Sequence, residues 1–426
     1  MTNEKEQTKV RAVGGTGSEL GSKSKDRVRN PEGVDAARLM SGEAWDDFCD
    51  KLKETGRHVL AEASLDSELD RSDGFRYLAN LTQAGIRHAF NLDPRFPKWV
   101  RHPDSTSKYG AENADNIYHF SKIRSDLRYR ISGRRNTATA FLLETKEGYM
   151  QLGDVENYST LDSEAMTVAP DGTFEIILSA EDPGGAPNWV PLHADATQVL
   201  IRQYLCDWET EVPAEFEIVC LDTEGESPEP LRPAPIARKL DDAAHWIETT
   251  IRVWNEWSVG YRERRKDGVL APAENYVGGA DDIFYGNDAY VLAPDEAIVI
   301  ESDVPDARYW HYQLVDAWLA SMDYTNGQTS LNHTQLHIDA DGKVRVVIAH
   351  RDPGVPNWLD TGGHLEGLIQ YRYIWANDNP QPTIRTLKLG DVRAALPADT
   401  PLVTLEARRE AIARRQAHIR RREPTC

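Results

Sequence analysis

The stretch DGTFEIILSAEDPGGAPNW at residues 171–189 returns as DGKVRVVIAHRDPGVPNW at residues 341–358. The offset is 170 residues through the Pro-Gly turn and 169 residues at the tryptophan, because the first copy contains one additional residue. In both copies Asp-Gly is typical of a hairpin turn, the apolar run of a strand, and Pro-Gly of a second turn. The closing tryptophan can cover one end of a sheet. The repeated order predicts two copies of one β-rich fold.

Strand-like segments with a period of two surround each copy of this motif, and helical patterns separate the two regions. Apolar residues recur at helical spacing over 41–90, 239–265 and 404–423. The order helix, sheet, helix, sheet favours an α+β fold over an alternating βαβ sheet. We therefore predict two antiparallel β-sandwich-like (jelly-roll-like) units related by an internal repeat. The predicted boundaries are 1–35 for a flexible tail, 36–110 for a helical N-terminal segment, 111–235 for the first β-sandwich unit, 236–282 for a connecting helix, 283–395 for the second β-sandwich unit and 396–426 for a basic C-terminal helix.

The composition restricts the partners. The 426 residues include 49 Lys and Arg against 69 Asp and Glu, a net charge of −20. Such an acidic chain repels nucleic acids and anionic membranes, so we expect neutral or cationic small molecules or other proteins as partners. No run approaches the about 18 apolar residues of a membrane span, and the start MTNEKEQTKVRAVGG has no apolar signal core, which predicts a cytoplasmic protein. The four cysteines are far apart without a CxxC, which favours free thiols over disulfides or zinc.

Candidate catalytic residues gather in the second β unit. Five of the 12 histidines lie there, and the second copy of the motif has His350 and Arg351 where the first has Ala180 and Glu181. Histidine can act as a general acid or base, and a carboxylate can orient it. For any single residue, a solvated turn is the simpler interpretation. The candidates for hydrolase or lyase chemistry are His350, Asp352, His364, Asp360, Asp323 and Tyr324.

Aromatic residues in the same unit predict a ligand pocket or, alternatively, an ordinary sandwich core. Arg202 and Arg308 lie among apolar and aromatic neighbours, so each needs a carboxylate partner, and Arg308 can alternatively bind an anionic ligand. His333 and His337 are four apart on a predicted strand, about 13 Å, too far for one ion, so we predict no metal. We predict no other cofactor. The ligand-binding candidates are Arg308, Trp310, Trp318, Trp358, Asn357 and His333.

Several of these segments resemble known families. PNWVPLHADATQVLIRQYLCDW (187–208) is similar to the end of the bacterial domain-of-unknown-function family twelve-fourteen, and HRDPGVPNWLDTGGHLEG (350–367) resembles a branch of it. DARYWHYQLVDAWLASMDYTNGQTS (306–330) is similar to its frequent partner, family twelve-fifty-four. The resemblance covers residues 110–395. It implies a β-sandwich-rich architecture with added helices and identifies no catalytic residues.

Two functions remain open from the sequence. The first is a cofactor-free acid–base enzyme acting on a small organic or glycan-like substrate in an aromatic pocket of the second β unit. The second is a non-catalytic ligand-binding or assembly protein whose repeat is architectural. The helix predicted over 404–423 carries seven arginines against three glutamates. It can dock on its own chain, or pair with another subunit and make the protein a homo-oligomer.

Overall fold

A computed structural model describes residues 20–21, 23–61, 63–276 and 283–423. These residues form two compact units. The N-terminal unit comprises residues 20–255 and 418–423, and the C-terminal unit comprises residues 256–417. Most of the predicted flexible tail, residues 1–19, lies outside the described residues. The rest of the predicted tail contains a short 3-10 helix at Ser24–Asp26 and the start of the first α-helix at Glu32.

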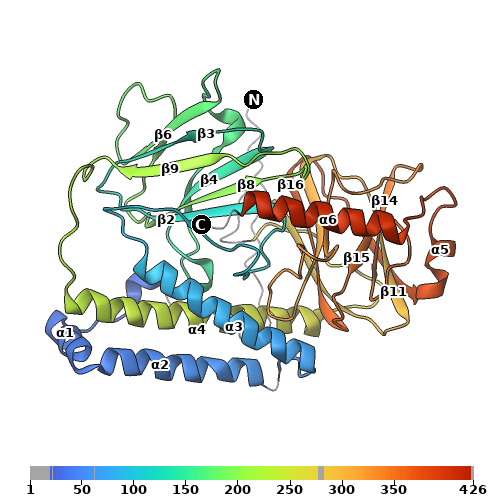
Figure 1. Ribbon diagram of the computed structural model, residues 1–426, viewed down its shortest axis with the longest axis horizontal. Coiled ribbons are helices and arrows are strands. Elements are labelled where there is room, and N and C mark those ends of the chain that lie inside the picture. The colour runs from blue at the N-terminus through green and yellow to red at the C-terminus, as the bar shows by residue number, and fades with distance from the viewer. Residues whose placement is uncertain (1–19, 22, 62, 277–282, 424–426) are drawn as a thin grey trace. The chain divides into compact units, whose positions relative to one another are not determined.

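Helices form one layer of the N-terminal unit (Figure 1). Ser67 caps α3 (Glu68–Phe90) by accepting a hydrogen bond from Asp70 N. Gly42 ends α1 (Glu32–Ser41) with φ +89°. Gly85 allows the third and fourth helices to touch, because an added Cβ would lie 2.5 Å from Ile247. The helices are α1 (Glu32–Ser41), α2 (Glu43–Thr55), η2 (Gly56–Leu60), α3 (Glu68–Phe90) and α4 (Pro233–Arg264), whose residues from Glu256 onward belong to the C-terminal unit.

Two sheets form the sandwich of the N-terminal unit. Their strand orders are β1-β2-β8-β4-β5 and β7-β6-β3-β9. Apolar side chains such as Tyr129, Phe141 and Ile176 fill the core. Arg202 has the carboxylate partner that the sequence predicts, Glu144, which is fully buried 3.1 Å away. The elements are β1 (Val100–Arg101), β2 (Asn116–Lys122), β3 (Tyr129–Arg134), β4 (Ala140–Lys146), η3 (Met150–Leu152), β5 (Asn157–Asp162), η4 (Ser163–Ala165), β6 (Thr173–Ser179), β7 (Trp189–Pro191), β8 (Gln198–Tyr204) and β9 (Glu215–Cys220).

The C-terminal unit repeats this topology. Its sheets have the orders β10-β16-β12-β13 and β15-β14-β11-β17, which match the first unit strand for strand apart from the additional β1. The α+β class and the internal repeat are thus confirmed. The pairs β6–β7 and β14–β15 are parallel, within otherwise antiparallel sheets. The elements are β10 (Ile283–Val291), β11 (Glu296–Asp303), β12 (Ala307–Val315), β13 (Ser330–Asn332), β14 (Lys343–Ala349), β15 (Trp358–Asp360), β16 (Glu366–Ala376), β17 (Thr383–Lys388), η5 (Leu389–Asp391), α5 (Val392–Ala395) and α6 (Leu405–Arg422).

The repeated motif makes the same contacts in both units. The Asn188 side-chain amide donates to two backbone carbonyls at 3.0 and 2.8 Å and accepts from a backbone N–H at 2.8 Å. Asn357 makes the equivalent three bonds at 2.7, 2.9 and 2.8 Å. The indole N–H of Trp189 and that of Trp358 each donate to a carbonyl of the preceding strand. Buried polar groups of the turn are thereby satisfied, so the shared motif serves the architecture.

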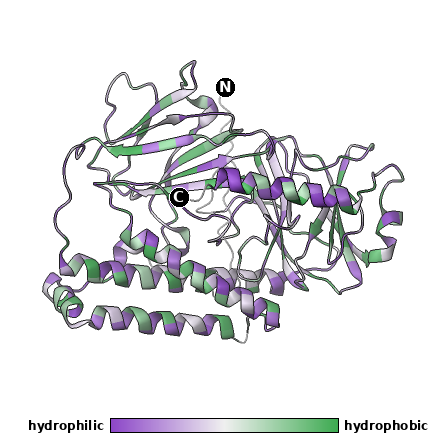
Figure 2. Cartoon of the chain, in the orientation of Figure 1, coloured by the Kyte–Doolittle hydropathy of each residue, from purple (hydrophilic) through white to green (hydrophobic). Residues whose placement is uncertain are grey.

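The C-terminal helix α6 is hydrophilic along most of its length (Figure 2), yet it is held by buried arginines. In the C-terminal unit, Arg408 donates to Asp352 at 2.8 Å and Arg415 donates to a backbone carbonyl at 2.9 Å. In the N-terminal unit, Arg422 donates to Ala114 O at 2.7 Å. The helix therefore docks on its own chain, and oligomerisation through it stays a prediction. No helix among the described residues has both the length and the apolar character needed to cross a membrane.

Candidate functional site

Three predicted catalytic residues, His350, Asp352 and Asp360, lie close together in the C-terminal unit. Both ring nitrogens of His350 are engaged, one 2.7 Å from Thr361 Oγ1 and the other 2.9 Å from a backbone carbonyl. Asp352 is paired with Arg408. Burial raises the pKa of Asp360, and its neighbour Asp352 adds to the shift. Three of the residues predicted together are therefore near one another in the structure. Each already makes a hydrogen bond or an ion pair with the surrounding protein.

The other predicted catalytic residues serve local structure. Asp323 accepts hydrogen bonds from two backbone N–H groups that follow it, both at 3.0 Å, as in a turn. Tyr324 is buried, and its carbonyl accepts from Arg415. The His364 side chain is buried, and its carbonyl accepts from the Tyr290 hydroxyl at 3.3 Å. Their catalytic roles stay predictions.

The predicted ligand-binding residues are largely part of the packed interior. Trp310 and Trp358 belong to hydrophobic clusters, and Trp318 is 1% exposed. The His333 ring lies 6.4 Å from that of Trp310, and Asn357 makes the turn contacts described above. The Arg308 guanidinium stacks 4.1 Å from the centre of the Trp375 ring. The same aromatic residues that predicted a pocket thus build the sandwich core, which was the alternative interpretation.

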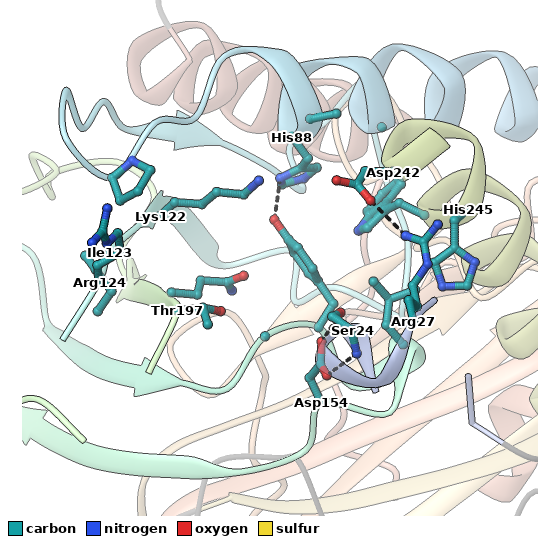
Figure 3. Close-up of a pocket in the computed structure, with 18 of the residues that line it drawn as sticks. Ser24, Arg27, His88, Lys122, Ile123, Arg124, Asp154, Thr197, Asp242 and His245 are labelled. Carbon is teal, nitrogen blue, oxygen red and sulfur yellow. Dashed lines mark hydrogen bonds and ion pairs between the residues drawn. The ribbon is translucent and has the colours of Figure 1, made fainter. Parts of the chain in front are cut away.

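A cavity of about 350 Å³ lies in the N-terminal unit, where α3 and α4 cover the outer face of β2 and β8 (Figure 3). Its size suits a small organic molecule. Apolar and aromatic side chains form most of its wall, and a few charged groups project into it. The lining residues that matter below are Arg27, Arg29, His88, Lys122, Tyr149 and Asp242, and Ile123, Leu152 and Trp246 contribute apolar wall.

A tyrosine and two histidines form a hydrogen-bonded chain beside the cavity. The Tyr149 hydroxyl is 2.6 Å from His88 Nδ1, and His88 Nε2 is 3.2 Å from His102 Nδ1. Burial lowers the pKa of His88 well below its usual range and that of His102 to about 3. Both imidazoles are therefore neutral at neutral pH, so each carries one N–H.

Within the described chain, no hydrogen bond at His102 fixes the donor-to-acceptor direction of this hydrogen-bonded chain. His102 Nε2 is buried and has no hydrogen-bond partner in the part of the chain that the structure describes. Tyr149 can donate to His88, which then donates to His102, or the whole chain can run in reverse. In the first state Tyr149 offers a lone pair to the cavity, and in the second it offers its O–H. The chain can therefore pass a proton to or from a molecule bound at Tyr149.

Lys122 ends β2 and extends into the cavity toward His88 (Figure 3). Its ammonium has no hydrogen-bond or ion-pair partner among residues 20–423 as described. Burial lowers the pKa of Lys122, and the nearby cations Lys239 and Arg29 lower it further, against the opposite effect of Asp242. By contrast, burial raises the pKa of Tyr149. A lysine with a lowered pKa and a tyrosine with a raised pKa at one cavity can act as a base and an acid.

Arginines from the N-terminal segment border the same cavity. Arg27 and Arg29 both donate to one oxygen of Asp242, at 2.8 and 2.7 Å. The segment is anchored by Ser24, whose backbone N–H and hydroxyl donate to the two oxygens of the Asp154 carboxyl. Burial raises the pKa of Asp154.

The sequence alone does not reveal this site, because the residues that line it come from seven separate segments without a common motif. One signal was available. Tyr118, Phe120 and Lys122 alternate along β2, so all three point to one face of the sheet. Tyr118 and Phe120 belong to a buried cluster on that face. A lysine in phase with buried aromatic residues predicts an unusual environment. In the described residues, no group of three or more His, Cys, Asp or Glu side chains is placed to hold a metal ion.

Fold and site define a duplicated β-sandwich protein with a helix-covered cavity in its first copy. Residues 109–207 and 278–373, one stretch in each copy, match the family described as "Protein of unknown function (DUF1214)". An uncharacterized protein from Burkholderia cenocepacia, known from a crystal structure, is 35% identical with a TM-score of 0.79, over 85% of this chain and 100% of that chain. The chain belongs to the DUF1214 family, which confirms the resemblance found in its sequence.

A second solved structure, of a protein from Vibrio parahaemolyticus, is 12% identical with a TM-score of 0.44, over 74% of this chain and 98% of that chain. A search of curated proteins found no match.

Proposed function

We propose that the protein is a cofactor-free acid–base enzyme of the hydrolase or lyase type, and that its active site is the cavity at Lys122 and Tyr149. The observation that carries this proposal is the placement of a half-buried lysine, without a partner in the described chain, beside a tyrosine–histidine–histidine chain at one cavity. Opposite pKa shifts in neighbouring groups are typical of acid–base sites.

In this proposal Lys122 is the base and Tyr149 the acid. The Lys122 amine removes a proton from the substrate or from a water molecule. The Tyr149 hydroxyl gives its proton to the oxygen on which negative charge develops, and the Nδ1–H of His88 donates a hydrogen bond to the tyrosinate oxygen. After product release Tyr149 takes a proton from water, and the Lys122 ammonium returns its proton to water. His102 is a positioning residue, because its Nδ1 hydrogen-bonds His88 and its ring stacks on Tyr109 at 4.8 Å. Ile123, Leu152 and Trp246 contribute apolar wall, which strengthens these interactions.

The test is a screen of small carbonyl compounds, esters and hydroxy acids in D₂O, in which ¹H NMR follows C–H exchange and product formation. Wild-type protein is compared with Lys122→Met, Tyr149→Phe and a control, Lys98→Met, at an exposed lysine of the same unit. Removal of a general acid or base should lower turnover by about 10²–10⁴-fold, and the control should not. A wild-type protein inactive on the whole panel, or full activity of both site variants, would contradict the proposal.

The C-terminal unit offers an alternative location. Asp360, with its raised pKa, lies near His350 and Asp352, and chemistry there was the expectation from the sequence. His350→Ala and Asp360→Asn distinguish the two locations, because they should leave turnover intact if the cavity in the N-terminal unit is the active site. The alternative function, a non-catalytic binding protein, predicts ligand binding in the cavity without any turnover.

A further inference from the structure

The charge inside the cavity has the opposite sign to the charge of the chain as a whole. The protein carries a net charge of −20, yet Arg27, Arg29 and Lys122 line the cavity. A local excess of positive charge is costly unless an anion neutralises it.

The two arginines share a single acceptor. Both donate to the same oxygen of Asp242, at 2.8 and 2.7 Å. One carboxylate therefore serves two guanidinium groups, each of which has five N–H donors. Both residues line the cavity. Those of their remaining N–H donors that face the cavity can bind a ligand.

Carboxylates other than Asp242 do little to neutralise the positive charge of Arg27, Arg29 and Lys122. The Asp154 carboxyl accepts hydrogen bonds from Ser24 through both oxygens. Arg124 also lines the cavity and is paired with Asp126 at 2.9 Å. Arg27, Arg29 and Lys122 thus line the cavity with one carboxylate, Asp242, as their shared counter-charge, and Lys122 has no hydrogen-bond or ion-pair partner within the described chain.

The rest of the wall is unsuited to a bare inorganic ion. Trp246 is 3% exposed and lies 6.0 Å from the Tyr149 ring, and Ile123 and Leu152 add aliphatic surface. Such a wall gains free energy by covering the apolar body of a ligand. The cavity therefore combines cationic side chains with apolar surface.

We propose that the cavity binds a small organic anion, such as a carboxylate with an aliphatic or aromatic body, with its charged end at Arg27 and Arg29. This inference rests on the proposed function in that it names the substrate class for the same site. A carboxylate can accept from two guanidinium groups at once, and such charge-assisted bonds are stronger than neutral ones. It would also place the carbon next to the carboxylate within reach of the acid–base pair.

Binding is testable without any turnover. Isothermal titration calorimetry on the full chain compares benzoate with its neutral isostere benzamide, with the cation benzylamine and with phenyl phosphate. Hexanoate replaces the ring by an aliphatic body. We expect an acid to bind at least about tenfold more tightly than benzamide, since charge-assisted bonds are worth about 1.5–3 kcal/mol. Tighter binding of phenyl phosphate than of benzoate would support the proposal and assign the anion to a phosphate.

Variants then locate the anion. Arg27→Gln leaves Arg29 to pair with Asp242, so the unit should still fold, and acid binding should weaken about tenfold. Lys98→Met should bind like the wild type. Binding of benzamide or benzylamine as tight as that of the acids, binding of none of the acids, or unchanged binding by Arg27→Gln would overturn the inference. Acid binding without turnover would uphold the inference and contradict the proposed enzyme activity, so the two failures are distinguishable.

Discussion

Lys122→Met should make the N-terminal unit more stable while it removes the proposed base. The Lys122 ammonium is largely buried and has no partner in the described chain. A buried polar group without a partner costs about 1–3 kcal/mol, and a charged one more. Methionine has a similar length and no charge, so we expect a gain of at least about 1 kcal/mol at pH 7. For a unit of this size, each kcal/mol raises the midpoint of thermal unfolding by about 2–4 °C.

The effect should depend on pH in a direction that the pKa shift fixes. The pKa of Lys122 is lowered in the folded protein, from an ordinary value of 10.5. Between the folded and the unfolded pKa, the unfolded chain binds more protons, so the stability of the wild type rises with pH in that range. The penalty is complete below the folded pKa and disappears as pH approaches 10.5. The advantage of Lys122→Met over the wild type should therefore shrink as the pH is raised.

Differential scanning calorimetry at several pH values between 6 and 9.5 measures this difference, and Lys98→Met controls for the loss of a positive charge. The two units can unfold separately, so the comparison uses the transition of the N-terminal unit. A Lys122→Met protein less stable than Lys98→Met, or an advantage that grows with pH, would refute the argument. Either result would mean that the native protein stabilises the ammonium.

Further predictions concern the fold. Asn188→Leu and Asn357→Leu should each destabilise their unit by about 3 kcal/mol, since each side chain makes three buried hydrogen bonds; a neutral effect in either copy, measured by calorimetry, would contradict the architectural role of the motif. Arg202→Met should cost about 3–5 kcal/mol because it leaves Glu144 buried without its partner, and a double variant that also has Glu144→Leu should recover most of it. Arg408→Met should lower the stability of the C-terminal unit by about 2–3 kcal/mol through the loss of charged hydrogen bonds; an unchanged melting profile would show that α6 is held by other contacts.

The fold was predictable because its information is local and repeated. A period of two along a strand, a glycine at a turn and a tryptophan after Pro-Asn are visible in a single sequence, and their recurrence fixes the duplication. The parallel pairing of β7 with β6 was not predictable, since Trp189–Pro191 is too short to show a period. The docking of α6 was one of two open alternatives. Leu405 is exposed, whereas arginines seven residues apart, at positions 408, 415 and 422, are buried.

The candidate site was not predictable in the same way. Its residues are close only after folding: His88 and Tyr149 are 61 positions apart in the sequence, and His102 is 14 positions from His88. Density of histidine and aspartate along the chain pointed instead to the C-terminal unit. There the structure shows the same residue types in turns and ion pairs, which are the commoner use of such side chains.

The repeat itself explains why a comparison of the two copies could not find the cavity. The strand pairing places Lys122 opposite Gln198 in the first copy and Val291 opposite Glu366 in the second, so Val291 stands where the first copy has the lysine. The difference between Lys122 and Val291 lies inside the repeat, but the side chains that surround Lys122 in the cavity come from outside the repeat. His88 lies on α3, Trp246 and Asp242 lie on α4, and Arg27 and Arg29 precede α1. A duplicated sandwich supplies two equivalent sheet faces, and only a face that is covered can exclude water and hold an unpartnered amine. The chemistry proposed for this cavity therefore depends on the helices added to the first copy, while the repeated strands support the residues that take part in it.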